Sequence, residues 1–579
     1  MTIKHALLIS PAFPVSYWSY TYALEFVRKK SNLPPLGLLT VAGLFPDDWS
    51  LRLVDLNVEP LRDEDLEWAD VVFTSTMIVQ EASLLEVVRR CNAASVPVVA
   101  GGPHPTALHA ELAEMLAPDH RIDHFVLGEA EGIVAELLSD LRAGRARPVY
   151  GPPPRPDIAD APLPRFDLLD PHQYGVMALQ FSRGCPFDCE FCDITVLFGR
   201  RPRTKSSTQM LAELDALLDT GWRGSVFLVD DNFIGNKRDA LLVLADVKQW
   251  QEQHGYPFSF MTEASVNLAE LTPLLELMRD CAFSMVFLGI ESPGEDALRA
   301  TSKGQNIGRS HEPAQHLLNA VRTIQSYGIE VTAGFIIGLD GDTEFDSHIA
   351  FIQKAGIPIA MTGLLTALKG TRLHTRLEQE GRLYGLSGGS NTEISLNFEP
   401  QLPRETLLAE YRRVIGTLYD PTLEGYFERC LTLLQHLARR EHEGRTIKWA
   451  EVRAILRSLR LQLFSRQGPA YARFLWTVLR EHPHHFAEAM RLAIKGYHFE
   501  KFTRQQLEVD AFARLLEDES SARRSGRVSF SDTAIARRYR RACHAVDRLF
   551  RQKLDELLTQ FQAEHAQPES GRTHHAGGR

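Results

Sequence analysis

Three cysteines, Cys185, Cys189 and Cys192, lie within eight residues of the chain. With three and then two residues between them, one short loop can direct three thiolates to a metal centre without supplying a fourth ligand. Structural zinc and most iron-sulfur clusters take four protein ligands. A cluster held by three thiolates would keep one iron open to a substrate or cosubstrate, so the spacing predicts catalysis rather than scaffolding.

Structural zinc and a disulfide framework are the alternatives for these cysteines. Zinc would need a fourth Cys or His at a second short spacing, and the next cysteine, Cys281, is isolated about ninety residues further on. Seven cysteines in 579 residues, without a secretion signal, are typical of a reducing cytoplasm. The remaining cysteines are expected to be ordinary buried thiols: Cys91, Cys281, Cys430 and Cys543.

The composition, with 44% hydrophobic and 24% charged residues, is that of a soluble globular protein with several domains. No apolar run reaches the roughly eighteen residues of a membrane helix, so we expect no membrane span and a cytoplasmic location. The net charge of −10 argues against nucleic acid as a partner. A helix expected near 533–561 carries an arginine-rich face, for which a solvated surface is favoured and peripheral membrane contact is left open.

From residue 3 to about 145, short apolar runs alternate with amphipathic stretches, the pattern of a doubly wound (Rossmann-like) α/β domain. Strands are expected at 5–10, 50–55, 70–75, 96–100 and 124–127, and helices at 36–45, 80–94, 107–116 and 130–142. Ligands of such sheets bind beyond the carboxyl ends of the strands. The candidate ligand contacts there are Ser10, Asn57, Thr74, Ser75, Gly101, Gly102, Pro103, His104, Gly128 and Glu129.

A second α/β region follows a proline-rich linker and predicts a partial or full (β/α) barrel. Its strands are expected at 225–229, 257–262, 285–290, 330–337 and 361–365. Barrel active sites lie at the carboxyl ends of the strands, where the polar candidates are Asp230, Asp231, Asn232, Glu263, Glu291 and Ser292. The expected division is 1–150 for the first domain, 151–165 for the linker, 166–395 for the barrel, 396–565 for an all-α domain and 566–579 for a disordered tail.

The cysteine run resembles the signature of the radical S-adenosylmethionine (SAM) enzymes, including the aromatic Phe191 before the third cysteine. A wider pattern over residues 5–430 resembles the cobalamin-dependent subgroup of that family. Within it, the chain is similar to the branch that has a carboxy-terminal domain without assigned function and includes the hopanoid 2-methylases. The segments that carry this resemblance are 34–39, 101–103, 128–131, 185–195, 199–205 and 227–235.

The resemblance implies three cofactors: a [4Fe-4S] cluster on Cys185, Cys189 and Cys192, SAM bound at its open iron, and cobalamin in the first domain. It places the SAM amino group near 230–232, with helix capping as the alternative, and the ribose at Glu291. It places adenine beside the strand that carries Gly334 and Gly338. Further candidates have structural alternatives: Glu263 and Ser265 at the barrel mouth, and Arg203 and Lys205 for the SAM carboxylate or a substrate anion.

The first domain lacks the Asp-x-His-x-x-Gly pattern of proteins that place a histidine below cobalt. The strings Asp119-His120 and Asp123-His124 have the wrong spacing. We therefore expect cobalamin to bind without a histidine below the cobalt, so that the lower face of the corrin is open or occupied by water. His104, in a loop after Gly-Gly-Pro, is interpreted as a corrin-edge or solvent residue.

Three functional hypotheses follow from these features. The first is methylation of an unactivated carbon through an adenosyl radical and methylcobalamin. The second is a non-methylating cyclisation or rearrangement, and the third is a non-catalytic cobalamin and iron-sulfur binding protein. A methylthiotransferase is set aside because the first domain has no second cysteine set. The expected partners are a small-molecule or lipid substrate and an electron donor such as flavodoxin or ferredoxin.

Overall fold

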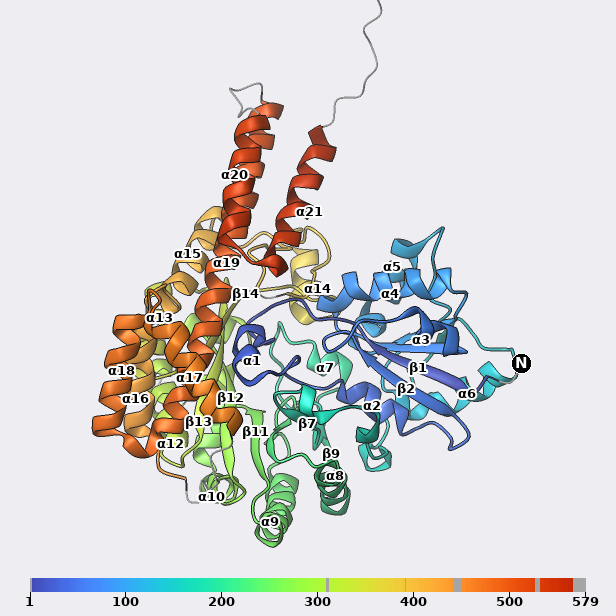
Figure 1. Ribbon diagram of the computed structural model, residues 1–579, viewed down its shortest axis with the longest axis horizontal. Coiled ribbons are helices and arrows are strands. Elements are labelled where there is room, and N and C mark those ends of the chain that lie inside the picture. Colours follow the sequence, from blue (N-terminus) through green and yellow to red (C-terminus); the bar gives the residue numbers. More distant parts are fainter. Residues whose placement is uncertain (1–2, 309–311, 391, 441–448, 526–531, 566–579) are drawn as a thin grey trace, which may run out of the picture. The chain divides into compact units, whose positions relative to one another are not determined.

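The computed structural model describes residues 3–308, 312–390, 392–440, 449–525 and 532–565. The chain divides into two compact units, residues 1–500 and 501–579. The first unit holds two parallel sheets and most of the helices (Figure 1). The expected tail at 566–579 lies outside the described residues.

The first sheet is wholly parallel, with strand order β2-β1-β3-β4-β5-β6. The order reverses between β1 and β3, and ligands of doubly wound folds bind at such a switch point. The predicted doubly wound fold is confirmed. The strands are β1 (His5–Ser10), β2 (Ser50–Asp55), β3 (Val71–Ser75), β4 (Val98–Gly101), β5 (His124–Val126) and β6 (Val149–Tyr150).

Alternation along β1 shows why helices cover both faces of this sheet. Ala6 and Leu8 pack into one buried cluster, whereas Leu7 and Ile9 pack into another, because successive side chains of a strand point to opposite faces. The helices α2 (Leu36–Ala42) and α6 (Val134–Arg142) cover the first face. The second face is covered by α3 (Asp63–Trp68), α4 (Glu81–Ala93) and α5 (Pro103–Leu116).

One helix of this domain begins earlier than predicted. We expected a helix at 107–116 preceded by a loop, but α5 begins at Pro103. Gly102, with φ 94°, turns the chain, and Pro103 has the fixed φ that suits a first helical position. His104 therefore lies in the first turn of α5 and is fully buried, so its interpretation as a solvent residue is wrong.

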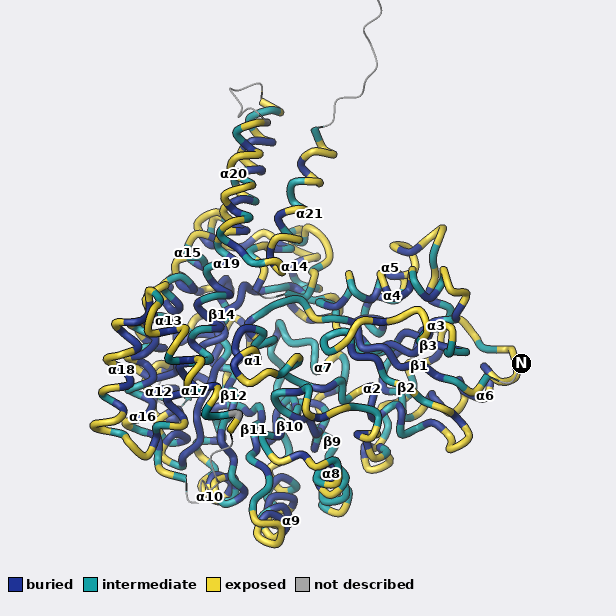
Figure 2. The backbone as a smooth tube through the Cα atoms, viewed as in Figure 1, coloured by how far each residue is buried: buried dark blue, intermediate teal, exposed yellow. Residues whose placement is uncertain are grey.

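The second sheet has six parallel strands in the order β14-β13-β12-β11-β10-β7. Because the order is sequential and β14 does not pair with β7 among the described residues, this is a partial barrel. The strands are β7 (Met177–Leu179), β10 (Gly224–Leu228), β11 (Phe258–Ala264), β12 (Phe283–Glu291), β13 (Glu330–Ile337) and β14 (Ala360–Leu364). Figure 2 shows these strands mostly buried behind helices with exposed outer faces. The helices between them are α8 (Ser207–Asp219), α9 (Lys237–His254), α10 (Thr272–Asp280), α11 (Glu295–Ala300), α12 (Pro313–Gln325) and α13 (Phe345–Ala355).

A small antiparallel hairpin and a short helix lie between β7 and β10. The hairpin strands are β8 (Ser182–Arg183) and β9 (Arg203–Thr204), and the helix is α7 (Ile194–Leu197). The hairpin holds the two ends of the cysteine loop together. It therefore fixes where that loop leaves and rejoins the barrel.

Helices follow the second sheet, as predicted. Those of the first unit are α14 (Arg372–Gln379), α15 (Arg404–Leu418), α16 (Glu424–His436), α17 (Trp449–Leu463) and α18 (Gly468–Glu481). A further helix, α1 (Thr21–Val27), lies between β1 and β2 of the first domain and was not predicted from the sequence. The long helix α19 (Phe486–Arg524) runs from the first unit into the second. Among the described residues, no helix is both long and apolar enough to cross a bilayer.

The single helix predicted near 533–561 is wrong. The second unit has two helices there, α20 (Asp532–Ala545) and α21 (Arg548–His565). Asp547 stands between them, and its side chain accepts a hydrogen bond from Leu549 N at 3.1 Å, as a helix-starting residue does. Ile535, Ala542 and Val546 are buried, but Leu549 is exposed.

Candidate active site

The three cysteines lie on one loop between β8 and α7, as free and half-buried thiols. Gly184 before them has φ 94°, and a Cβ there would lie 2.8 Å from Gly199 O, so only glycine suits this position. Cys185 N donates to the same Gly199 carbonyl at 3.2 Å. The loop is therefore closed across its base.

The donor set fits an iron-sulfur cluster. Within the described residues, no three His, Cys, Asp or Glu side chains meet around a single ion position, whereas a cluster takes each thiolate on a different iron. Burial raises the pKa of the Cys185 thiol above its ordinary value, and it raises the pKa of Cys192 to about 12. Bound iron would add the positive charge that keeps such buried thiols deprotonated.

Two amides point at the thiol sulfurs. Asn232 Nδ2 lies 3.8 Å from Cys185 Sγ, and Gln305 Nε2 lies 3.8 Å from Cys189 Sγ. Such N–H donors tune the potential of a cluster. Asn232 was a sequence candidate, but Gln305 was missed, because it follows α11 without any recognisable pattern.

Asp230 and Asp231 anchor the backbone of the cysteine loop. Asp230 accepts hydrogen bonds from Ser182 N and Phe181 N, and Asp231 accepts one from Gly184 N at 2.9 Å. Burial raises the pKa of Asp230 to about 7 and that of Asp231 to about 6. Neither carboxylate caps the following helix α9, whose capping side chain is Asn236. Their contact with the SAM amino group stays a prediction.

Glu263, at the end of β11, has a carboxylate to which no described residue donates a hydrogen bond. Burial raises its pKa to about 8, and the nearby carboxylates of Asp231, Asp230 and Glu291 add to the shift. Its neighbour Ser265 donates from its backbone N–H to Asn232 Oδ1 at 3.2 Å. Glu263 is therefore an acid of this edge that the described residues leave unengaged, and its contact with SAM stays a prediction.

Glu291 ends β12 in a conformation that non-glycine residues rarely adopt, with φ 65°. Its carboxylate accepts from the buried Lys303 Nζ at 2.7 Å. Burial alone would lower the pKa of Lys303, but Glu291 and the thiols of Cys189 and Cys192 outweigh it and hold the pKa above its ordinary value. The Lys303 ammonium therefore lies between Glu291, the predicted ribose contact, and the cysteine loop.

The remaining SAM candidates have structural neighbours. Ser292 Oγ accepts from Gly294 N at 3.0 Å, ahead of α11. A Cβ at Gly334 would lie 3.0 Å from the Phe287 ring, and one at Gly338 would lie 3.0 Å from Leu407. Arg203 and Lys205 are engaged in ion pairs inside the protein, Lys205 with Glu213 and Arg203 with Glu129.

The carboxyl edge of the first sheet carries buried polar atoms without partners. The hydroxyls of Thr74 and Thr76 have no hydrogen-bond partner in the described structure. Neither ring nitrogen of His104 has an aligned partner there, although Nε2 lies 3.3 Å from Glu81 Oε2. Unpartnered buried polar groups are costly, and they fit a polar ligand at this edge.

The glycines of this edge bring the backbone close together. A Cβ at Gly102 would lie 2.7 Å from Ser75 Oγ. Gly128 N donates to Thr106 Oγ1 at 2.9 Å, and that hydroxyl donates to Gly102 O at 2.7 Å. At the neighbouring strand ends, Asn57 accepts from Phe13 N, and Asp55 accepts from Asn57 and Tyr174.

Glu129 joins the two sheets. It was predicted to contact cobalamin, but it is buried, accepts from Arg183 at 2.7 Å and pairs with Arg203 at 2.6 Å. Arg183 also pairs with Glu131 at 2.7 Å. Because Arg183 and Arg203 belong to β8 and β9, the edge of the first sheet is tied to the base of the cysteine loop.

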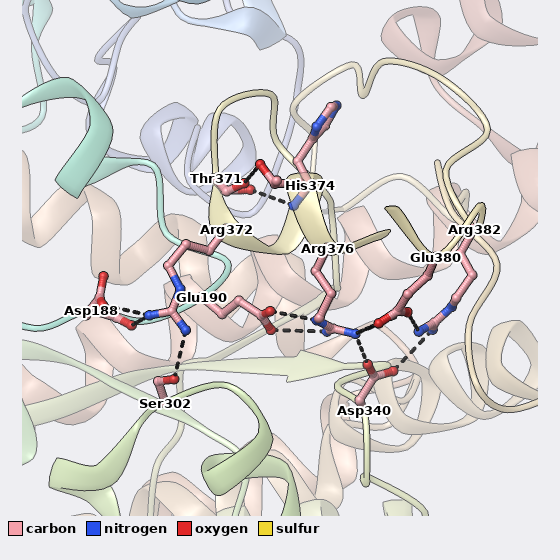
Figure 3. Close-up of polar contacts among 11 residues, drawn as sticks. Asp188, Glu190, Ser302, Asp340, Thr371, Arg372, His374, Arg376, Glu380 and Arg382 are labelled. Atoms are coloured by element: carbon pink, nitrogen blue, oxygen red, sulfur yellow. Dashed lines mark hydrogen bonds and ion pairs between the residues drawn. The ribbon is translucent and has the colours of Figure 1, made fainter. Parts of the chain in front are cut away.

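Helix α14 also holds the cysteine loop, through two arginines (Figure 3). Arg376 donates to both oxygens of Glu190, at 2.6 and 3.1 Å, and pairs with Asp340 at 2.9 Å. Arg372 donates to Asp188 at 2.6 Å. These arginines were missed by sequence reasoning, because partners 184 and 186 residues apart leave no local signal.

Three family models match successive parts of the chain. They are a B12 binding domain at residues 27–138, the radical SAM superfamily at 179–352 and a domain of unknown function, DUF4070, at 371–510. The last begins at the start of α14. The three matches therefore cover β2 to β5 of the first sheet, most of the partial barrel and the helices from α14 into α19.

Curated relatives match over more than two thirds of the chain. An uncharacterized methyltransferase of Synechocystis is 44% identical over 73% of this chain and 77% of its own length. The hopanoid C-2 methylase of Rhodopseudomonas palustris is 35% identical over 72% of this chain and 78% of its own length.

Solved structures share the fold at low sequence identity. The cobalamin-dependent radical SAM enzyme OxsB superposes with a TM-score of 0.57 at 13% identity, covering 96% of this chain and 84% of its own. The methyltransferase TsrM from Kitasatospora setae gives 0.52 at 14% identity, covering 86% and 99%. From its domains and its relatives, the chain belongs to the cobalamin-dependent radical SAM methyltransferases, which use a [4Fe-4S] cluster, SAM and cobalamin.

Proposed function

We propose that this protein methylates an unactivated carbon of an apolar polycyclic lipid of the hopanoid class. The substrate class is supported by the 35% identity to a hopanoid C-2 methylase over 72% of this chain. The structural observation that carries the chemistry is the tie of Glu129 to Arg183 and Arg203. It holds the ligand edge of the B12-binding sheet against the cysteine loop.

The chain's own residues would hold and orient the three cofactors. Cys185, Cys189 and Cys192 would ligate the cluster, while Asp230 and Asp231 fix their loop. The SAM contacts remain those proposed from the sequence, except that Glu263 replaces the run 230–232 as the contact of the amino group, because Asp230 and Asp231 already bind the backbone of the cysteine loop. The cobalamin contacts would be the strand ends around Thr74 and Gly102. When bound, the groups supply hydrogen-atom abstraction by an adenosyl radical and methyl transfer from cobalamin.

A cluster of this kind needs an electron donor, for which we propose a flavodoxin or ferredoxin. The three free thiols must stay reduced to bind iron, which favours a reducing compartment such as the cytoplasm. Methylation rather than cyclisation is favoured by both curated relatives, because each is named as a methyltransferase or methylase.

Anaerobic turnover tests the proposal. Reconstituted holoenzyme would be incubated with a reductant, a hopanoid and SAM that carries a deuterated methyl group, and the products measured by mass spectrometry. We expect 5'-deoxyadenosine, S-adenosylhomocysteine and a hopanoid that has gained the labelled methyl group. The matched control is Cys189→Ala, which should form none of them.

Two outcomes would contradict this function. Formation of 5'-deoxyadenosine without S-adenosylhomocysteine would indicate the non-methylating alternative. Methylation of a non-lipid substrate, with hopanoids left unchanged, would retain the chemistry and overturn the substrate class.

A further inference from the structure

The helices α17 and α18 pack against each other through a polar inner face. Ala454, Ser458 and Gln462, one helical turn apart along α17, are all buried. Ser458 Oγ lies 2.9 Å from the Tyr471 hydroxyl of α18 and accepts from Gln462 Nε2 at 2.8 Å. This inner face holds α17 in place with small and polar side chains.

The outer face of α17 exposes large apolar side chains, which a helix on a water-facing surface normally buries. Trp449 is 79% exposed and Leu456 is 59% exposed, and both lie on the side opposite Ser458. Phe464, just after the helix, is 89% exposed. On α18, Trp476 and Leu479 are also exposed, by 60% and 59%.

Exposed apolar side chains are concentrated on these two helices. Of the nineteen large apolar residues that are exposed in the described structure, seven lie between residues 449 and 482. That segment is 34 of the 579 residues of the chain. Scattered apolar residues on a surface need no explanation, whereas a group of this kind marks an interaction site.

The same surface is basic within an acidic protein. Residues 449–482 contain six arginines and two glutamates, a net charge of +4, whereas the whole chain carries −10. Arg453, Arg460 and Arg466 are exposed and have no ion-pair partner among the described residues. Arg453 follows Trp449, and Arg460 follows Leu456, by four residues, so cationic and apolar side chains share one face.

We propose that the outer face of α17 and α18 docks on the surface of a bilayer that contains anionic lipids. Tryptophan and phenylalanine beside unpaired arginines match the boundary between acyl chains and phosphate headgroups. A protein partner would have to cover the arginines with carboxylates, whereas lipid phosphates meet them along the whole face. Docking would be peripheral, in keeping with the absence of a spanning helix among the described residues.

Vesicle sedimentation tests this proposal without turnover, so its result is independent of the substrate. Full-length holoenzyme would be mixed with phosphatidylcholine vesicles that contain or lack about a quarter phosphatidylglycerol. We expect binding to the anionic vesicles, weakened by salt. The triple variant Leu456→Glu, Phe464→Glu, Trp476→Glu should lose at least about tenfold in partitioning. Replacing Arg453, Arg460 and Arg466 by Gln should also cost about tenfold or more and remove most of the salt dependence.

The matched control is Leu242→Glu on α9, where the leucine is 56% exposed on the barrel. It should bind vesicles like the unchanged protein, and circular dichroism should show every variant folded. The proposal is overturned if neither kind of vesicle binds, or if Leu242→Glu weakens binding as much as the triple variant. It is also overturned if the unchanged protein is a dimer that the triple variant dissociates, because the face would then join two copies.

Discussion

The carboxyl edges of the two sheets differ in how many of their polar side chains already have hydrogen-bond partners within the protein. At the barrel edge, Asp230, Asp231 and Glu291 already accept hydrogen bonds from the backbone or from Lys303. At the edge of the first sheet, the hydroxyls of Thr74 and Thr76 have no partner in the described structure. The barrel edge is held by these hydrogen bonds and ion pairs and is called the rigid edge. The edge of the first sheet keeps unpartnered hydroxyls and is called the open edge.

The difference follows from what each edge has to do. A cluster loop must stay in one position relative to its cosubstrate, and ion pairs and backbone anchors provide that rigidity. A large flat ligand instead needs space and polar groups that it can satisfy itself, which glycines and free hydroxyls provide. Glu129 follows a strand of the open edge, but its ion pairs are with Arg183 and Arg203, which hold the cysteine loop of the rigid edge.

The largest effect is expected from Arg376→Ala, which leaves the buried Glu190 carboxylate without its cation. Losing one partner of such a pair is strongly destabilising locally. We expect SAM cleavage to fall by roughly tenfold or more, with partial rescue by Arg376→Lys and a changed electron paramagnetic resonance signal of the reduced cluster. Arg413→Ala, which removes an exposed ion-paired arginine, is the control. Full activity with an unchanged signal would show that α14 does not position the loop.

Glu129→Gln should separate the two edges. The neutral amide weakens the pairs with Arg183 and Arg203 without changing the shape of the side chain. Methyl transfer should fall about three- to tenfold while SAM cleavage stays nearly unchanged, measured as the ratio of S-adenosylhomocysteine to 5'-deoxyadenosine. Glu136→Gln, which alters an exposed pair with Arg147, should leave the ratio alone. Equal loss of both products would mean that Glu129 serves the barrel only.

The raised pKa of Glu263, at the barrel edge, predicts that the stability of the protein depends on pH. Its pKa is raised to about 8 from an ordinary 4.5, so the folded state keeps a proton that the unfolded chain loses. Stability without SAM should therefore fall as the pH rises between these values. We expect the melting temperature to drop by about 2–5 °C more in the unchanged protein than in Glu263→Gln between pH 5 and 8. If the melting temperatures of the two proteins changed with pH in parallel, the raised pKa of Glu263 would be contradicted.

The smallest effect is expected at the open edge. Thr74→Val removes one unpartnered hydroxyl and keeps the shape of the side chain. If that hydroxyl bonds cobalamin, affinity should fall about two- to threefold, measured by absorbance titration. Thr220→Val, on the barrel surface, is the control. Unchanged or tighter binding would place the ligand elsewhere.

The sequence predicted what local spacing can encode. The cluster ligands could be predicted because Cys185, Cys189 and Cys192 lie close together in one loop. The strand at His5–Ser10 has the predicted bounds because its apolar run is long. The strand β7 was missed because three residues show no period. The ion pairs of Glu129 were not predicted, because its partner Arg183 lies 54 residues away. Long-range pairs of this kind appear only once the chain is folded.

Helix α14 has a consequence for how the parts of this protein can be exchanged between relatives. The region of unknown function begins at residue 371, yet its first helix donates to the backbone of the cysteine loop, since Leu373 N bonds Glu190 O at 3.0 Å. The boundary drawn from family models therefore does not divide independent modules. A hybrid enzyme that keeps its cluster should be joined after Gln379, so that α14 travels with the barrel.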